Sequence, residues 1–145
     1  MKLYTIGFTK KTARQFFGLL KASGAKRLVD IRLNNVSQLA GFAKKEDLAY
    51  FIKELCDMDY VHLPELAPTQ EILDEFKKRK GDWDVYEQRF LALMKQRKIE
   101  TFADPEIIRD SCLLCSEDAP THCHRRLVAE YLRDAWKDID IIHLK

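Results

Sequence analysis

The chain has 145 residues, of which 46% are hydrophobic, the size and composition of one domain with one apolar core. Its 25 Lys and Arg residues nearly balance 23 Asp and Glu residues, so the formal net charge of +2 excludes bulk electrostatic attraction to nucleic acid. No apolar run is long enough to cross a membrane and no signal-peptide pattern opens the chain, so we expect a cytoplasmic protein without a membrane partner. Four cysteines are too few for a disulfide scaffold, and we expect free thiols.

Short apolar segments alternate with segments whose apolar residues recur every three or four positions, which predicts strands alternating with helices. In chain order, the sequence predicts a strand over 2–7, a helix over 13–20, a strand over 27–32, a helix over 48–55, a strand over 60–63, helices over 72–76 and 83–94, a strand over 112–115, a helix over 127–135 and a strand over 139–144. Five Gly, four Pro and no low-complexity run indicate a single domain over 1–145 without a long linker.

Polar residues stand where several of these helices should begin. Thr9 is expected to open the first helix and Ser23-Gly24 to close it, while Thr69 and Asp82 are expected to cap the two helices in the middle of the chain. We interpret residues 69–110 as a helical insertion that covers one side of the sheet.

Strands that alternate with helices pair in parallel through right-handed crossovers. This predicts an α/β fold, a three-layer Rossmann-like sandwich of about five mostly parallel strands flanked by helices. Ligands of such folds bind beyond the carboxyl ends of the strands. The candidate residues at that edge are Gly7 and Thr9, Asp30 and Arg32, Pro64 and Glu65, Cys115 and Glu117, and those that begin the helix after Thr121.

The segment 115–126, CSEDAPTHCHRR, joins a predicted strand to an amphipathic helix and carries several reactive side chains. With Thr121 or His122 as the helix cap, Cys123 falls in the first helical turn, where unpaired backbone N–H groups and the helix dipole favour an anion. The same environment favours the thiolate of Cys123. The two arginines that follow oppose the dipole, so helix stability alone does not explain them.

Two other interpretations concern the cysteines. A metal site would need Cys115, His122, Cys123 and His124 to converge, but neighbouring residues on a helix point about 100° apart and the spacing matches no common zinc pattern. Cys112-x-x-Cys115 has a redox spacing, but positions three apart in a strand face opposite sides, which favours packing in the core.

Asp30 and Arg32 lie two positions apart at a strand end and therefore share a face. Arg32 can bind an anion while Asp30 orients it, or the two can form a local ion pair that holds the loop. Glu65, directly after Pro64, is the better acid or base at this edge, because a single histidine in a strand, such as His62, is more often hydrogen-bonded in the core.

Six short motifs occur in the order and approximate spacing of a known family. They are Thr5-Ile6-Gly7, Val29-Asp30-Ile31-Arg32, His62-Leu63-Pro64-Glu65-Leu66, Tyr86, Leu114-Cys115-Ser116-Glu117 and Cys123-His124-Arg125. Over nearly its whole length the chain resembles the domain-of-unknown-function family 488, most specifically in the Cys-His-Arg element that follows the Leu-Cys-x-Glu strand. The resemblance implies a compact α/β domain of prokaryotic type, without naming a reaction.

The chain departs from the family pattern at two places. Phe8-Thr9 stands where the family commonly has His-Ser, which removes a candidate general base, and Asn35 stands where it commonly has proline. The Asp-x-Arg element and the cysteine loop also resemble rhodanese-like and phosphatase-like anion sites. The arginines here follow Cys123 directly, however, and do not close a C-x5-R ring.

We therefore expect a cysteine-dependent enzyme that binds a phosphorylated or nucleotide-like small molecule, with no particular cofactor predicted. The expected catalytic residues are Cys123, His124, Glu65 and Glu117, the anion-binding residues are Arg32, Arg125, Arg126 and Thr9, and the supporting residues are Asp30, Cys115 and Tyr86. The alternatives are a non-catalytic module that binds nucleic-acid phosphates, with Trp83 and Tyr86 stacking on bases, and a Cys/His metal-site protein.

Overall fold

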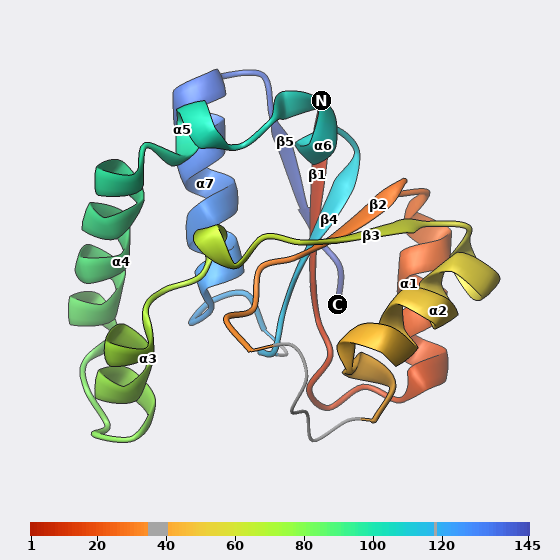
Figure 1. Cartoon of the computed structure of the whole chain (residues 1–145), viewed down its shortest axis with the longest axis horizontal. Coiled ribbons are helices and arrows are strands. Elements are labelled where there is room, and N and C mark those ends of the chain that lie inside the picture. Colours follow the sequence, from red (N-terminus) through yellow and green to blue (C-terminus); the bar gives the residue numbers. More distant parts are fainter. Residues whose placement is uncertain (35–40, 118) are drawn as a thin grey trace.

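A computed structural model describes residues 1–34, 41–117 and 119–145. Its described residues form one five-stranded sheet with the strand order β3-β2-β4-β1-β5, in which every neighbouring pair is parallel (Figure 1). The strands are β1 (Lys2–Gly7), β2 (Arg27–Asp30), β3 (Asp59–His62), β4 (Ser111–Cys115) and β5 (Asp140–His143). The predicted three-layer α/β fold is confirmed.

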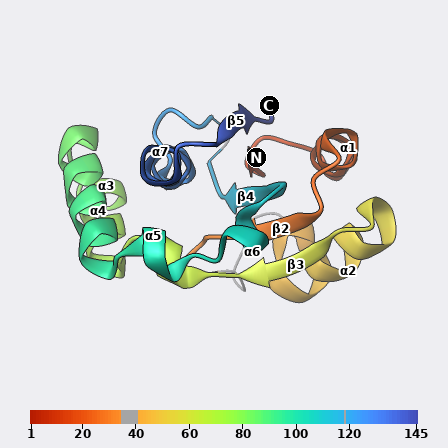
Figure 2. The ribbon, with the colours of Figure 1, turned by 90° about the horizontal axis from the view of Figure 1, so that it is seen from above.

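Helices cover both faces of this sheet (Figure 2). They are α1 (Ala13–Ser23), α2 (Lys45–Cys56), α3 (Gln70–Lys77), α4 (Trp83–Arg97), α5 (Ile99–Phe102), α6 (Pro105–Ile108) and α7 (His124–Trp136), with short 3-10 turns over Gly41–Ala43 and Pro64–Leu66. On one face α1 and α2 pack on the sheet, and on the other face α7 lies against it with α4 packed on α7 and α3 on α4. Within the described residues, no helix is long and apolar enough to cross a membrane.

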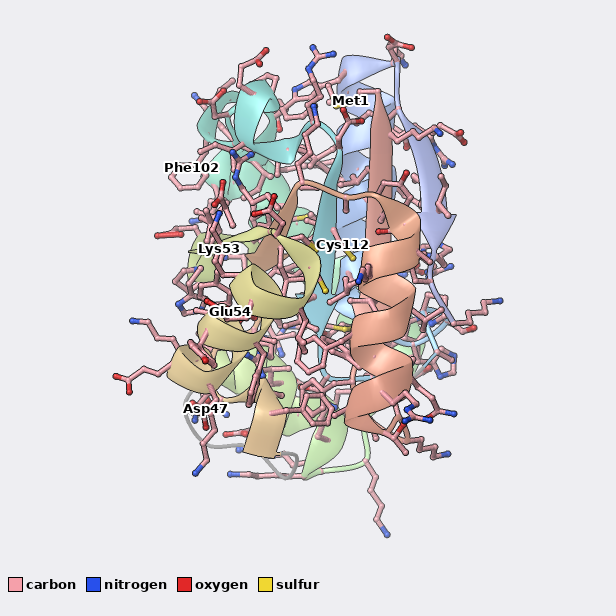
Figure 3. All side chains as sticks on the ribbon, turned by 90° about the vertical axis from the view of Figure 1, so that its right-hand side faces the viewer. Met1, Asp47, Lys53, Glu54, Phe102 and Cys112 are labelled. Carbon is pink, nitrogen blue, oxygen red and sulfur yellow. A yellow bond between two sulfur atoms is a disulfide. The ribbon has the colours of Figure 1, made fainter. Side chains whose placement is uncertain are left out.

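The strands β1, β2, β4 and β5 supply side chains to both apolar layers, because successive side chains of a strand point to opposite faces. In β4, Leu113 packs with α4 and α7, while Cys112 and Leu114 pack with α1 and α2. After Ser111, the buried strand β4 is therefore a continuous apolar run, as expected for a parallel strand covered on both sides. Figure 3 looks onto the face that carries α1 and α2 and labels Cys112 on β4.

The caps of α3 and α4 are the predicted ones, whereas that of α1 is not. Thr69 accepts a hydrogen bond from Ile72 N–H, and Asp82 accepts one from Asp84 N–H. The prediction that Thr9 opens the first helix is wrong, because Thr12 is its N-cap in a reciprocal capping box with Gln15. Both Thr9 and Thr12 precede the apolar residues of α1. Only Thr12 has a Gln three residues later, and this spacing of a capping box identifies it as the N-cap.

The connections that leave β2 and β4 run to opposite faces of the sheet, although these strands are neighbours. The chain after β2 leads to α2 on one face, and the chain after β4 leads to α7 on the other. Such a change of direction separates the two loops and opens a crevice at the carboxyl ends of the strands, which is where open α/β sheets bind ligands. The fold therefore marks the space beyond Asp30 and Cys115 as the candidate site.

Candidate functional site

A pocket of about 330 Å³ lies at this change of direction. The ends of β2 and β4, the start of α7 and one side of α3 and α4 surround it. Its lining residues are Arg32, Leu33, Asn34, Gln70, Leu73, Asp74, Phe76, Lys77, Lys78, Tyr86, Cys115, Ser116, Glu117, His122, Cys123 and His124. Six of the eleven predicted site residues are among them, namely Arg32, Tyr86, Cys115, Glu117, Cys123 and His124.

Cys115 and Cys123 form a disulfide at the wall of this pocket. Cys115 is the last residue of β4, and Cys123 follows eight residues later at the start of α7. Both are buried, whereas Cys56 and Cys112 are free cysteines. The expectation of free thiols is therefore wrong for the pocket pair, because the short loop between β4 and α7 folds back and returns Cys123 to the end of the strand it left.

Cys123 occupies a different backbone position from the predicted one. It is the N-cap of α7, with extended φ and ψ angles of −138° and 141°, and the helix begins at His124. Neither Thr121 nor His122 is the cap, and Cys123 does not lie in the first turn. Since an extended cap residue does not follow the helical rotation of about 100° per residue, the side chains of Cys123 and His124 can converge on Cys115.

His124 is buried, and a hydrogen bond and a ring contact hold its side chain in place. Its Nε2–H donates to the carbonyl of Ile31 at 2.7 Å, and its ring meets that of Phe90 edge-on. Because a carbonyl only accepts, Nε2 carries the proton and Nδ1 keeps the lone pair. Burial lowers the pKa of His124 to about 4, so the ring is neutral at physiological pH and is a weak proton acceptor there.

Arg32 is buried with 3% of its surface exposed, and Asp30 holds it. The Nε and Nη2 groups of Arg32 donate to the two carboxylate oxygens of Asp30 at 2.8 and 2.6 Å, and the hydroxyl of Tyr60 donates to the same carboxylate. The third guanidinium nitrogen, Nη1, is buried and has no hydrogen-bond partner among the described residues. The ion-pair interpretation of Asp30 and Arg32 is confirmed, and anion binding by Arg32 stays a prediction for a guanidinium that lines the pocket.

Arg125 is also fully buried but does not line the pocket. Its Nε donates to Thr5 Oγ1, and its Nη1 donates to Cys115 Sγ at 3.3 Å and to the carbonyl of Glu117. A guanidinium in contact with a cysteine sulfur favours the thiolate form of that cysteine when the disulfide is reduced. Arg125 thus contacts Cys115 from behind the pocket wall, and its predicted role in anion binding stays a prediction.

Glu117 and Tyr86 form the side of the pocket nearest to α3 and α4. The carboxylate of Glu117 is paired with the ammonium group of Lys77. Burial, with a smaller contribution from the charge of Glu117, raises the pKa of Tyr86, whose hydroxyl therefore stays protonated and can donate a hydrogen bond. This side of the pocket presents one paired carboxylate and one neutral donor.

The remaining predicted residues lie outside the pocket lining. Thr9 is exposed and donates to the carbonyl of Ser116, and Arg126 pairs with Glu87 on α4. Glu65 lines a different cavity, of about 420 Å³, together with Arg97. The nitrogen Nε2 of His62 donates to the carbonyl of Arg32, which fits the predicted hydrogen-bonded role of this histidine.

The contribution of α3 to the pocket lining was not predicted from the sequence. The pocket is lined from this helix by Gln70, Leu73, Asp74, Phe76 and Lys77, and by Lys78 at its C-cap. His122 also lines it, with its ring stacked on that of Trp83 at 4.9 Å. The cap at Thr69 predicts the helix, but no local signal shows that one side of this helix faces the ends of β2 and β4. Only the packing of α3 on α4, and of α4 on α7, decides that orientation.

A comparison with protein-family models matches residues 12–132 to the family described as Domain of unknown function DUF488. The chain belongs to this family. The DUF488 match includes both strands whose ends form the pocket, β2 and β4, as well as the cysteine pair. A search of curated proteins and a search of solved structures each give no match. Membership in the DUF488 family names no reaction.

Proposed function

We propose that this protein is an enzyme that acts on a phosphorylated or otherwise anionic small molecule bound in the pocket between the ends of β2 and β4. The observation that carries the proposal is Arg32, a buried guanidinium that lines the pocket and has one nitrogen, Nη1, with no acceptor in the part of the chain that the structure describes. Buried polar groups normally have partners, and an unpaired charged donor is costly. An anionic oxygen of a ligand supplies the acceptor that Nη1 of Arg32 lacks.

The cations that line the pocket are Arg32, Lys77 and Lys78. Each is paired with a carboxylate, Arg32 with Asp30, Lys77 with Glu117 and Lys78 with Asp74, so the free donor of Arg32 and not an excess of charge favours an anion. The fork between Arg32 and Asp30 fixes the guanidinium plane before any ligand arrives, so little side-chain entropy is lost on binding.

The reactive end of the proposed active site is the group formed by Cys115, Cys123 and His124. In the disulfide neither sulfur is a nucleophile, so the thiol form is the state in which these cysteines act. Glu117 is the carboxylate of the pocket wall suited to move a proton, whereas His124 is too weak a base at neutral pH. Glu65 is not part of the proposed site, because it lies in a separate cavity.

The test is a calorimetric titration of the protein with inorganic phosphate and with a nucleoside monophosphate, which measures the affinity for each. Loss of a charged hydrogen-bond donor in Arg32→Gln is expected to weaken binding roughly 10- to 100-fold. Arg126→Gln is the matched control, since Arg126 is a nearby arginine of α7 that does not line the pocket, and its affinity should equal that of the wild type.

Arg32→Gln leaves Asp30 without its ion-pair partner and can reduce stability, so a second variant is needed. Asp30→Asn with Arg32→Gln removes both charges of the pair together, and circular dichroism reports whether each variant folds. Folded variants that bind phosphate as tightly as the wild type contradict the proposal. So does a wild type that binds neither probe.

A nucleic-acid-binding module is the second candidate, favoured by the stacked rings beside the pocket. The ring of Trp83 stacks with those of Tyr86 and His122, at interplanar angles of 21° and 26°. Such rings can stack on bases, and Lys77 and Lys78 lie on the neighbouring helix. An affinity for a single-stranded oligonucleotide that exceeds the nucleoside monophosphate affinity and falls steeply with salt supports this candidate over the enzyme.

A further inference from the structure

The two sulfur atoms of Cys115 and Cys123 and a ring nitrogen of His124 lie within 4.8 Å of one another. All three residues are buried and line the same pocket. Ligands of one tetrahedral zinc ion lie roughly 3.5 to 3.8 Å apart, as bond lengths of about 2.3 Å to sulfur and 2.0 Å to nitrogen require. The three side chains therefore need only small movements to surround one ion.

We propose that the reduced protein binds one thiophilic divalent cation of the Zn²⁺ type through Cys115, Cys123 and His124, with a fourth coordination position open to the pocket. Two thiolates and one imidazole are a ligand set that Zn²⁺ accepts, and three protein ligands with one open position are typical of catalytic zinc. The metal site itself does not depend on the proposed function. Only the role of its open position, which would face the anionic ligand, rests on that function.

The groups around the three ligands fit this role. The Nε2–H of His124 donates to the carbonyl of Ile31, which leaves Nδ1 as the nitrogen that can ligate and fixes the orientation of the ring. The Nη1 of Arg125 donates to Cys115 Sγ, a contact that stabilises a thiolate ligand. Metal-ligating histidines and cysteines commonly have such outer hydrogen bonds.

Disulfide formation and metal binding exclude each other at this site. A dithiol reductant supplies two electrons and two protons, which break the bond between the sulfurs of Cys115 and Cys123 and give two thiols. Binding of Zn²⁺ then displaces one proton from each thiol. The disulfide is thus the metal-free state, and the dithiol is the state that binds the cation.

The open position would place the cation beside a ligand held by Arg32, since Arg32 and the three side chains line one pocket. Bound there, Zn²⁺ polarises an anionic oxygen or lowers the pKa of a bound water. In that state Cys123 serves as a ligand and not as the nucleophile.

The experiment titrates Co²⁺ and Zn²⁺ into the full chain after reduction with a phosphine, which does not compete strongly for the metal. We expect one equivalent of Co²⁺ to bind, with the visible absorption of tetrahedral cobalt and a thiolate-to-cobalt band, and we expect none in the oxidised protein. Cys115→Ser and Cys123→Ser should abolish these bands. His124→Gln should weaken cobalt binding by at least roughly 10- to 100-fold, which is the effect of losing a residue that only hydrogen-bonds to a metal ligand.

Cys112→Ala is the matched control, because Cys112 lies on the same strand as Cys115 but packs on the side of α1 and α2 (Figure 3). Its cobalt spectrum should equal that of the wild type. A reduced wild type that binds no cobalt, or Cys115→Ser and Cys123→Ser variants with unchanged spectra, overturns the proposal.

Inorganic phosphate added to the cobalt-loaded protein tests the open position. A change in the cobalt spectrum is expected in the wild type and should be smaller in Arg32→Gln. An unchanged spectrum in the wild type overturns the open position. Phosphate binding by the oxidised, metal-free protein tests the anion pocket separately. The oxidised protein therefore reports on the proposed function alone, and cobalt binding by the reduced protein reports on the metal site alone.

Discussion

At the scale of single residues, the carboxylate of Asp30 organises the side of the pocket that Arg32 lines. It accepts hydrogen bonds from the backbone and the guanidinium of Arg32 and from the hydroxyl of Tyr60. These contacts fix Arg32 in one orientation at the pocket wall. Arg125 is equally buried but is bound to Thr5, Cys115 and the loop carbonyl of Glu117, so two arginines of the same chemistry have different roles.

Gly7 is the residue that permits the loop after β4 to approach Arg125. A Cβ atom at Gly7 would meet the carbonyl oxygen of Glu117 and the Nη1 of Arg125. Gly7→Ala should therefore reduce the free energy of unfolding by roughly 1–3 kcal/mol or more, because backbone has to move. Gly18→Ala is the control, since its Cβ meets nothing within 4 Å and the change in an exposed helix should add about 0.5–1 kcal/mol.

Urea unfolding of both glycine variants measures these differences. Equal stability of Gly7→Ala and the wild type would contradict the close approach of the loop. Because the approach also positions Arg125, a destabilised but folded Gly7→Ala should show slower alkylation of Cys115 after reduction.

At the scale of elements, the start of α7 decides what the cysteine segment can do. The extended conformation of Cys123 directs its side chain back to the end of β4, and the helix proper begins with His124. Farther along, α7 is held by α5: the hydroxyl of Tyr131 donates to the carboxylate of Glu100, and Trp136 Nε1–H donates to the carbonyl of Glu100. The helix that carries the site is thus fixed at its far end by a titratable contact.

The hydrogen bond from Tyr131 holds the pKa of Glu100 below its ordinary value of 4.5. A carboxyl group with a lowered folded-state pKa contributes stability above its unfolded pKa, and this contribution is lost as the pH falls through the folded pKa. Tyr131→Phe should therefore be less stable than the wild type near pH 7, and the difference should shrink below about pH 4.

Urea unfolding over this pH range tests the contact between α5 and α7, with Tyr50→Phe as the control because Tyr50 is exposed. If the difference in free energy of unfolding between Tyr131→Phe and the wild type stays constant from neutral to acid pH, the hydrogen bond from Tyr131 does not lower the pKa of Glu100.

At the scale of the whole molecule, the sheet separates two apolar clusters. Ile52 lies in the cluster with α1 and α2, and Ile99 lies in the cluster with α3, α4, α5 and α7. Four of the strands, β1, β2, β4 and β5, contribute side chains to both clusters, so the same strands form part of both cores. This arrangement supports the pocket, because the loops from β2 and β4 start from a sheet that is packed on both faces.

Ile52→Val and Ile99→Val should each lower the free energy of unfolding by about 0.5–1.5 kcal/mol, since both side chains are fully buried. The double variant should lose the sum within about 0.5 kcal/mol, because the sheet separates the two sites. A single unfolding transition by fluorescence and circular dichroism is expected for all three variants. Two transitions, or strong non-additivity, would contradict a shared sheet with separate cores.

The sequence by itself determined the order of strands and helices and the edge of the sheet where the reactive residues gather. Local periodicity sets those elements, and residues at the ends of parallel strands share one edge wherever the strands lie. The disulfide partner of Cys123, the buried roles of Arg32 and Arg125, and the pocket wall from α3 required the tertiary structure. Those features depend on which strands are neighbours, on one extended cap residue and on how α3 and α4 pack beside α7, and none of these is a property of a short stretch of sequence.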